Sequence, residues 1–273
     1  MDWVEDFYSR TGRWWAEAES GLGDRDRGRV ERLHRVCGSE PRRVLELGCG
    51  YGTTAAAFAD AGHQVVAVEL TDRADQAKAH LERLGPERLQ IVRGDFYTAT
   101  FAGRFDTVTY WNGFGIGSDA DQRRLLRRIA EEWLEPDGTA LVDVYNPLVW
   151  ASWDGEVELL QANPERGYHH ELQQHLTFDP VTATAVDTWW DTAEPERRIT
   201  QRLRCYTPAD LRLLLEGTGL ALAGVLVGGE PVDLAADHTG DAAWLRDHYE
   251  YLAVLEPTSE GARAQDARRY SEE

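Results

Sequence analysis

The sequence predicts an α/β fold in which a doubly wound, mostly parallel sheet carries a smaller antiparallel sheet. Three observations predict this class. Residues 44–61 read as a buried strand, a glycine turn and a helix. Strand-like and helix-like segments then alternate as far as residue 144, which is typical of βαβ units. From residue 146 this alternation gives way to three strand-like runs.

The alternating region defines five strands. They are expected at residues 43–47, 64–69, 89–92, 105–110 and 139–144, with helices near 53–61, 73–84 and 119–134. Residues 135–138 (Glu-Pro-Asp-Gly) predict a turn after the last of these helices, because proline and glycine rarely continue a helix. Residues 2–36 read as one or two helices rich in aromatic side chains. In open parallel sheets ligands bind beyond the carboxyl ends of the strands, so the site is expected there.

The region after the fifth strand predicts an antiparallel lid. Its strand-like runs cover residues 168–178, 182–191 and 197–206, with turns at 179–181 and 194–196. Alternation along the first run gives it an apolar face that is expected to turn inward. This face holds Tyr168, His170, Leu172, Leu176 and Phe178.

The last part of the chain predicts a return to the main sheet. Thr207 and Pro208 open a helix as a capping residue and a first-position proline. Two further strands are expected at residues 220–227 and 249–256. The residues from about 257 onward are polar and are expected to be frayed.

Composition excludes several classes of protein. The chain has 273 residues and a net charge of −19, which argues against a nucleic-acid surface or an anionic membrane as partner. It has no apolar run of about 20 residues and no signal-peptide core near its first residues. Its three cysteines are scattered, so neither a disulfide framework nor a metal site is expected. These features predict a soluble, cytoplasmic protein.

The glycine turn is the clearest sign of a ligand site. Gly48, Gly50 and Gly52 stand at every second position between a buried strand and a helix. Glycines allow a ligand to approach the backbone, and a helix N-terminus presents N–H groups beside the positive end of its dipole. A polar or negatively charged small molecule is therefore expected here. The dinucleotide fingerprint G-x-G-x-x-G fits less well, because Thr53 stands at its third glycine position.

The pattern G-x-G-x-G behind an acidic residue, here Glu46, resembles motif I of Rossmann-like (class I) S-adenosylmethionine-dependent methyltransferases. Two further marks follow at that family's spacing. Glu69 ends the second strand about 20 residues after the first glycine, as ribose recognition requires. Gly94-Asp95-Phe96 resembles the adenine-binding motif, and residues 105–112 resemble the fourth motif.

This resemblance implies the cofactor S-adenosylmethionine and a seven-stranded sheet of order 3-2-1-4-5-7-6 with an antiparallel last inserted strand. It also implies an antiparallel β lid inserted after strand 5, as in small-molecule members of the family. The expected units are an N-terminal helical cap (1–36), a cofactor-binding core (37–146), a lid (147–206), the remainder of the core (207–256) and a polar tail (257–273).

The resemblance also implies a set of cofactor-binding residues. They are Tyr8, Trp14, Glu46, Gly48, Cys49, Gly50, Gly52, Glu69, Leu70, Asp95, Phe96 and Trp111. The aromatic N-terminal segment either packs on the domain or covers the cofactor as a flap, with Arg13 near the methionine carboxylate. Trp111 either packs on the cofactor or belongs to the core.

The methyl acceptor is expected to be a small molecule. Residues 112–115 (Asn-Gly-Phe-Gly) lack the N/D-P-P-Y/F motif of nucleic-acid amino-methyltransferases. Ten tryptophans suggest an aromatic pocket suited to a flat apolar metabolite or a cationic amine. The expected substrate-binding residues are Asn112, Phe114, Asn146, Trp150, Trp153 and Tyr168.

Methyl transfer from a sulfonium requires mainly alignment and exclusion of water. A general base is needed only if the acceptor must lose a proton. His170, then His169, are candidates because the histidine pKa lies near neutrality, although a solvent-facing lid histidine is an equal alternative. Asp143 and Tyr145 at the end of the fifth strand are the other candidates. Whether nitrogen or oxygen accepts the methyl group stays open.

Two other classes of function remain as alternatives. A catalytically silent copy of the fold would bind a partner protein without turnover, and an NAD-dependent oxidoreductase would need the missing third glycine. Lids of this type often pair subunits in the family, so a homo-oligomer is a further expectation.

Overall fold

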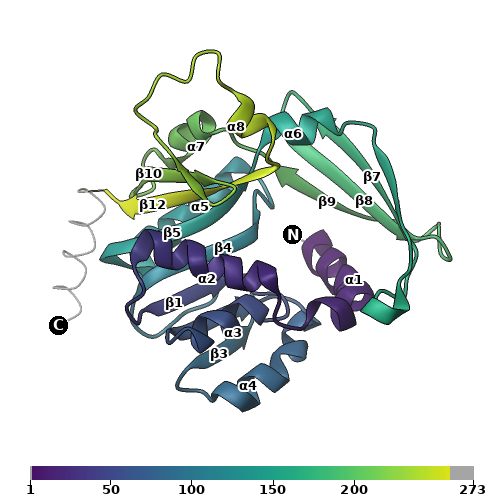
Figure 1. Cartoon of the computed structure of the whole chain (residues 1–273), viewed down its shortest axis with the longest axis horizontal. Helices are drawn as coiled ribbons and strands as arrows, with labels where there is room; N and C mark the ends of the chain where they lie inside the picture. The colour runs from purple at the N-terminus through teal and green to yellow at the C-terminus, as the bar shows by residue number, and fades with distance from the viewer. Residues whose placement is uncertain (1, 259–273) are drawn as a thin grey trace.

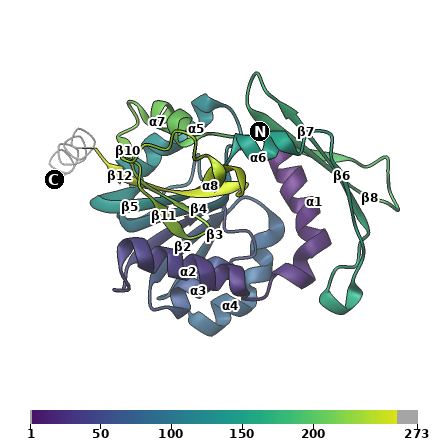
Figure 2. The ribbon, with the colours of Figure 1, turned by 45° about the horizontal axis from the view of Figure 1, so that its top comes forward.

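The computed structural model describes residues 2–258. Residue 1 and residues 259–273, which include most of the expected polar tail, lie outside the described part. The described chain forms an eight-stranded sheet and a four-stranded sheet, with the helix α1 (Asp2–Glu19) between them (Figures 1 and 2). The larger sheet has helices on both faces, as the alternation of strands and helices predicts.

The large sheet has the strand order that the resemblance implies. The order is β11-β10-β12-β5-β4-β1-β2-β3. β1 to β5 run parallel, whereas β12 is antiparallel to both β5 and β10. An eighth strand, β11, extends the edge by a tight hairpin with β10 and was not predicted. The strands are β1 (Arg43–Leu47), β2 (Gln64–Glu69), β3 (Leu89–Arg93), β4 (Phe105–Phe114), β5 (Leu134–Tyr145), β10 (Leu220–Val227), β11 (Glu230–Val232) and β12 (Glu250–Pro257).

Two apolar layers cover the large sheet. One face packs against α2 (Asp24–Cys37), α3 (Thr53–Asp60) and α4 (Lys78–Leu84), with Leu33 and Phe58 fully buried. The other face packs against α5 (Asp119–Arg128), a π-helical turn η2 (Ile129–Trp133) and α7 (Pro208–Leu215). Thr207 caps α7 as predicted, because its hydroxyl accepts a hydrogen bond from the Asp210 N–H.

Two local predictions are wrong. Residues 135–138 do not form a free turn; they belong to β5, where the register with β4 jumps from Phe105↔Leu134 to Thr107↔Thr139. The proline and glycine are accommodated as an irregularity in a strand pair. The helix expected at 73–84 is divided into a 3₁₀ helix η1 (Asp72–Ala77) and α4, with Thr71 capping the first part.

The lid has four strands rather than the three predicted. They follow a short helix α6 (Pro147–Ser152) and lie in the order β6-β7-β8-β9, all antiparallel. The strands are β6 (Val157–Leu160), β7 (Leu172–Asp179), β8 (Thr184–Asp191) and β9 (Ile199–Arg204), with a 3₁₀ turn η3 (Pro164–Arg166) after β6. β7 begins at Leu172, so Tyr168 and His170 precede the strand on which they were predicted.

The N-terminal helix α1 closes the space between lid and core (Figure 2). Phe7 and Trp14 are buried against Leu172, Trp189 and Ile199 of the lid. The opposite side of α1 contacts η1 of the core. A short helix α8 (Ala243–Arg246) lies near α6, at the other end of the lid.

Candidate cofactor and acceptor site

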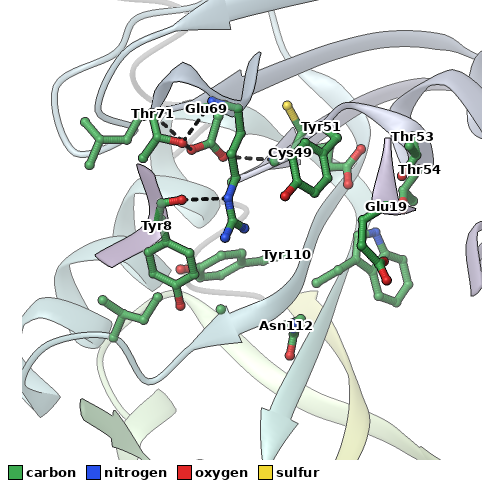
Figure 3. Close-up of a pocket in the computed structure, with 18 of the residues that line it drawn as sticks. Tyr8, Glu19, Cys49, Tyr51, Thr53, Thr54, Glu69, Thr71, Tyr110 and Asn112 are labelled. Carbon is green, nitrogen blue, oxygen red and sulfur yellow. Dashed lines mark hydrogen bonds between the residues drawn. The ribbon is translucent and has the colours of Figure 1, made fainter. Parts of the chain in front are cut away.

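A cavity of about 490 Å³ lies where the carboxyl ends of β1, β2 and β4 meet α1 and the lid (Figure 3). Elements far apart in the sequence supply its wall. The lining residues are Val4, Tyr8, Trp15, Glu19, Arg25, Arg29, Glu46, Gly48, Cys49, Gly50, Tyr51, Thr53, Thr54, Glu69, Leu70, Thr71, Arg73, Asp95, Phe96, Tyr97, Tyr110, Trp111, Asn112, Gly113, Ile116, Leu160 and Tyr168.

The glycine turn forms the floor of this cavity. Gly48, Gly50 and Gly52 have φ values of +63°, +56° and +73°, a region that favours glycine. Gly48 and Gly50 line the cavity, and a Cβ on Gly50 would meet no protein atom within 4 Å. Gly52 does not line it. A Cβ there would lie 2.7 Å from Cδ1 of Ile91, so this glycine serves helix–strand packing.

Glu69 ties the glycine turn to the end of β2. Its Oε2 accepts the Gly50 N–H at 2.9 Å, and its Oε1 accepts the Thr71 N–H and hydroxyl at 2.9 and 2.7 Å. An ionised carboxylate has about four acceptor positions, so about one remains for a ligand hydroxyl. This arrangement fits recognition of a ribose at the edge of the cavity.

Glu46 presents a buried acceptor at the cavity. Its side chain is 2% exposed, and Oε2 has no hydrogen-bond partner among residues 2–258. Burial raises the pKa of Glu46 to about 8, with Arg29 acting in the opposite direction. An unpartnered buried carboxyl group would gain from a cation placed beside it. The amino group of S-adenosylmethionine is such a cation, so Glu46 and the open space above Gly50 fit this cofactor.

One face of α1 forms the wall opposite the glycine turn. Val4, Tyr8, Trp15 and Glu19 line the cavity, and their spacing of four, seven and four residues places them on one helical face. Trp14 points to the lid instead, where it is 9% exposed. The structure therefore brings Tyr8 to the site and leaves Trp14 in an apolar cluster.

Arg73 fixes α1 against the core. Its Nε donates to the Tyr8 carbonyl oxygen at 2.8 Å and its Nη2 to the Thr11 hydroxyl at 2.6 Å. Its guanidinium also lies 5.1 Å from the Tyr8 ring and 5.3 Å from the Tyr51 ring. Tyr51 in turn donates to the carbonyl oxygen of Gly12 at 2.8 Å. One side of α1 thus lines the cavity, and the other side packs on the lid.

Five further expected cofactor residues lie at or near the carboxyl ends of the parallel strands. Cys49, Leu70, Asp95, Phe96 and Trp111 all line the cavity. Within the described residues, Trp111 Nε1 is a buried donor with no partner, and the Arg29 guanidinium lies 5.2 Å from its ring. Arg13 is mostly exposed and pairs with Asp72 at 3.3 Å, away from the lining.

Two of the six expected substrate residues, Asn112 and Tyr168, line the cavity. Asn112 has a positive φ of 53°, and its Oδ1 accepts the Tyr145 hydroxyl at 2.7 Å. The Tyr168 hydroxyl donates to Glu19 Oε1 at 2.6 Å, which connects the lid to the end of α1.

The other four expected substrate residues have packing roles. Phe114 is 1% exposed in the core of the large sheet. Asn146 is fully buried, caps α6 and donates to two carbonyl groups before β12. Trp150 and Trp153 pack on one another with ring centroids 5.3 Å apart, and the Trp150 indole donates to Tyr249 O.

None of the four expected catalytic side chains is part of the cavity lining. His170 is 40% exposed and its Nδ1 lies 2.6 Å from Asp191; His169 is 49% exposed and lies 2.8 Å from Glu17. Asp143 is buried 3.9 Å from Arg29 of α2, and burial raises its pKa above the usual range of a carboxyl group. Tyr145 reaches the cavity only through Asn112.

Several lining residues were not predicted. Arg25, Arg29 and Arg73 reach the cavity from helices, and Trp15, Glu19, Tyr51 and Tyr110 complete its wall. The spacing of Trp15 from Tyr8, one heptad on a helix, was a usable signal for one of them. The arginines carry no local signal, because the contacts that bring them to the cavity join distant parts of the chain.

Comparison with known proteins agrees with this geometry. Residues 44–138 match a protein-family description named "Methyltransferase domain". A cypemycin N-terminal methyltransferase from Streptomyces sp is 37% identical over 212 residues, which is 70% of this chain and 78% of that protein. The chain belongs to the S-adenosylmethionine-dependent methyltransferases.

Solved methyltransferases share the fold. The CcbJ methyltransferase of Streptomyces caelestis superposes with a TM-score of 0.67 at 23% identity, over 85% of this chain and 90% of that one. A 1,6-didemethyltoxoflavin-N1-methyltransferase of Burkholderia thailandensis, solved with S-adenosylhomocysteine, has a TM-score of 0.57 at 19% identity, over 93% and 86% of the two chains. The methyltransferase therefore has a Rossmann-like core with an inserted antiparallel sheet, and as a member of its family it uses S-adenosylmethionine.

Two further findings concern residues 2–258 of the methyltransferase. No helix in this range is long and apolar enough to cross a membrane. No group of three His, Cys, Asp or Glu side chains in the same range is arranged to hold a metal ion.

Proposed function

We propose that this methyltransferase transfers the methyl group of S-adenosylmethionine to the nitrogen of an amine, carried by a small specialised metabolite or by the N-terminus of a short peptide. The observation that carries the proposal is the wall of the cavity, which is lined by many aromatic rings, whereas the carboxyl group of Glu46 is left for the amino group of the cofactor. Aromatic faces and carboxylates attract ammonium and sulfonium groups. The relative that is 37% identical is named as an N-terminal methyltransferase, which supports nitrogen over oxygen.

The residues of the chain hold and align the reactants in this proposal. Bound S-adenosylmethionine supplies an electrophilic methyl group on a sulfonium. The glycine turn leaves room for it, Glu69 accepts from its ribose and Glu46 faces its amino group. Tyr8, Trp15 and the lid exclude water, so alignment supplies most of the acceleration.

Proton transfer needs no side-chain base in this scheme. An ammonium acceptor must lose one proton before its nitrogen attacks, and the two candidate histidines, His169 and His170, lie outside the cavity lining. The amine therefore enters in its neutral form after losing a proton to solvent, and the methylated product regains its charge in the cavity. The helical cap (1–36) and the lid (147–206) act together as the cover of a core built from 37–146 and 207–256.

The proposal is tested in two stages. Calorimetric titration with S-adenosylmethionine, S-adenosylhomocysteine and NAD is expected to show binding of the first two alone. Transfer of a labelled methyl group is then measured to a hexapeptide with a free N-terminal amine, to its N-acetylated counterpart, to an aromatic amine and to a phenol. Methylation of an amine supports the proposal. Methylation of the phenol alone, or cofactor binding without turnover on any probe, overturns it.

A further inference from the structure

The lid contains a buried carboxylate that makes no ion pair with any residue in the range 2–258. Asp187 on β8 is 2% exposed. Three neutral side chains donate to it: Gln174 Nε2 to Oδ1 at 2.8 Å, Trp189 Nε1 to Oδ2 at 2.8 Å and Gln201 Nε2 to Oδ2 at 2.7 Å. Burying a carboxylate without an ion pair costs free energy, so we ask what the hydrogen bonds of Asp187 do in the protein.

The chemistry of these groups fixes the direction of each hydrogen bond. An indole N–H only donates and an ionised carboxylate only accepts, so Asp187 is the acceptor. The amide of Gln201 must therefore turn its NH₂ group toward Asp187 and its carbonyl oxygen away from it. That oxygen, Oε1, lies 2.9 Å from the Tyr8 hydroxyl and accepts its proton. The orientation of the Gln201 amide thus links Asp187 of the lid to Tyr8 of α1.

This chain of bonds determines what Tyr8 offers to the cavity. Tyr8 lines the cavity, where Figure 3 shows it together with Tyr110 and Asn112. The Tyr8 hydroxyl donates its single proton to Gln201, so its oxygen can only accept a hydrogen bond from a ligand. Arg73 holds the Tyr8 backbone through its carbonyl oxygen, and its guanidinium lies 5.1 Å from the Tyr8 ring. Burial raises the pKa of Tyr8 well above its usual value, so the hydroxyl stays neutral.

We infer that the Asp187–Gln201–Tyr8 chain of hydrogen bonds, called here the relay, makes Tyr8 an acceptor-only contact that selects methyl acceptors able to donate a hydrogen bond at this point. The inference rests on the proposed function in one respect, that the donor is the N–H of an amine. An ether, ester or tertiary amine at the same place would meet lone pairs only. Methylation of the neutral amine gives an ammonium that keeps each N–H of the amine, so the nitrogen of a tertiary product loses this contact only when it gives up its last proton to solvent.

The relay predicts a specific pattern in a double-mutant cycle. Asp187→Asn keeps the shape but gives residue 187 an NH₂ group, which allows the Gln201 amide to turn and present its own NH₂ to Tyr8. Tyr8 then accepts that bond and directs its proton into the cavity. With the best amine from the acceptor screen, KM is expected to rise about 10-fold, the loss of about one hydrogen bond, with kcat changed much less. In a Tyr8→Phe background the same substitution is expected to change KM less than about 2-fold, because nothing remains to reorient.

Matched variants separate the relay from a structural role of the lid. Asp179→Asn alters an exposed carboxylate at the end of β7 and is expected to leave KM unchanged. Equal affinity for S-adenosylmethionine in all variants shows that the fold and the cofactor site are intact. If Asp187→Asn costs as much in the Tyr8→Phe background as in the wild type, the effect is structural and the relay is refuted.

A neutron structure of the deuterated wild-type protein tests the relay without any substrate. The relay requires deuterons between Gln201 Nε2 and Asp187 and between the Tyr8 oxygen and Gln201 Oε1. A Tyr8 deuteron directed into the cavity overturns it. If the acceptor screen finds a phenol instead of an amine, the proposed function fails. The neutron structure and the cycle, run with that phenol, still decide whether the relay exists, because a phenol also donates a hydrogen bond.

Discussion

Replacing Gly50 by valine separates the approach of the cofactor from backbone strain. Gly50 has φ +56° and faces the cavity, whereas Gly217 has φ +70° in an exposed turn after α7. At both positions an added Cβ meets no protein atom within 4 Å. Gly50→Val and Gly217→Val therefore share a backbone cost of about 1–2 kcal/mol. For a chain of this size each kcal/mol lowers Tm by about 2–4 °C.

Only Gly50→Val is expected to lose affinity for the cofactor. A side chain at residue 50 occupies the space of the ligand, and displacement of the turn breaks the bond from the Gly50 N–H to Glu69. A hydrogen bond to a charged group is worth about 1.5–3 kcal/mol. The dissociation constant for S-adenosylmethionine is therefore expected to rise about 10- to 150-fold. Calorimetry gives the affinity and thermal unfolding gives Tm. Equal affinity of the two valine variants at equal Tm would refute this account of the turn.

Three further outcomes are expected. Glu69→Gln should weaken S-adenosylmethionine binding about 10- to 100-fold, since its amide NH₂ must face either the Gly50 N–H or the Thr71 N–H, both of which are donors. The exposed Glu87→Gln should bind the cofactor normally, and identical titrations of the two variants would contradict this expectation. Burial and the neighbouring His34 lower the pKa of His63 below 6.5. As the pH drops, this histidine is protonated in the unfolded chain before it is protonated in the folded chain. The free energy of unfolding should therefore fall below about pH 6.5. Urea unfolding at pH 7.5 and 5.5 should show a smaller drop for His63→Gln, and an equal drop would exclude this residue as the source. Thr207→Ala should lower the unfolding free energy by about 1 kcal/mol, with Thr207→Ser close to wild type; a neutral alanine would argue against the cap.

The part of the site built from the parallel sheet was predictable from the sequence. Parallel strands end at one edge, so the residue that follows each strand must lie near the others. Glu46, Gly50, Glu69, Asp95 and Trp111 come from four strands and all line the same cavity. The prediction needed only the strand boundaries, which short apolar runs and glycines mark clearly.

The part of the site built from α1 was only half predictable. Helical spacing puts Trp15 on the face of Tyr8 and puts Trp14 on the face of Phe7. Which face meets the cavity depends on the lid, because Phe7 and Trp14 are buried by lid residues that follow roughly 160 to 190 residues later in the chain. The pattern of polar and apolar residues along one helix cannot predict a contact with such a distant part of the chain.

The start of the first long lid strand was predicted wrongly for a similar reason. Strand alternation was extended back to Tyr168, but β7 starts at Leu172. Before it the chain crosses to α1, where Tyr168 bonds to Glu19 and His169 pairs with Glu17. These long-range contacts override the local β pattern, and they turn His169 toward the exposed side of α1 rather than toward the cavity.

The position of α1 between the lid and the core makes closure of the cavity depend on contacts that are distant in the sequence. The Tyr8 hydroxyl bonds to Gln201, 193 positions further along the chain, and Arg73 joins the same helix to the core. Contacts between segments this far apart in the sequence cost more loop-closure entropy than contacts between neighbouring segments, and chains rich in such contacts fold more slowly. Because this contact holds α1 over the cavity, a chain in which α1 has not docked leaves the glycine turn open to solvent and cannot exclude water from methyl transfer.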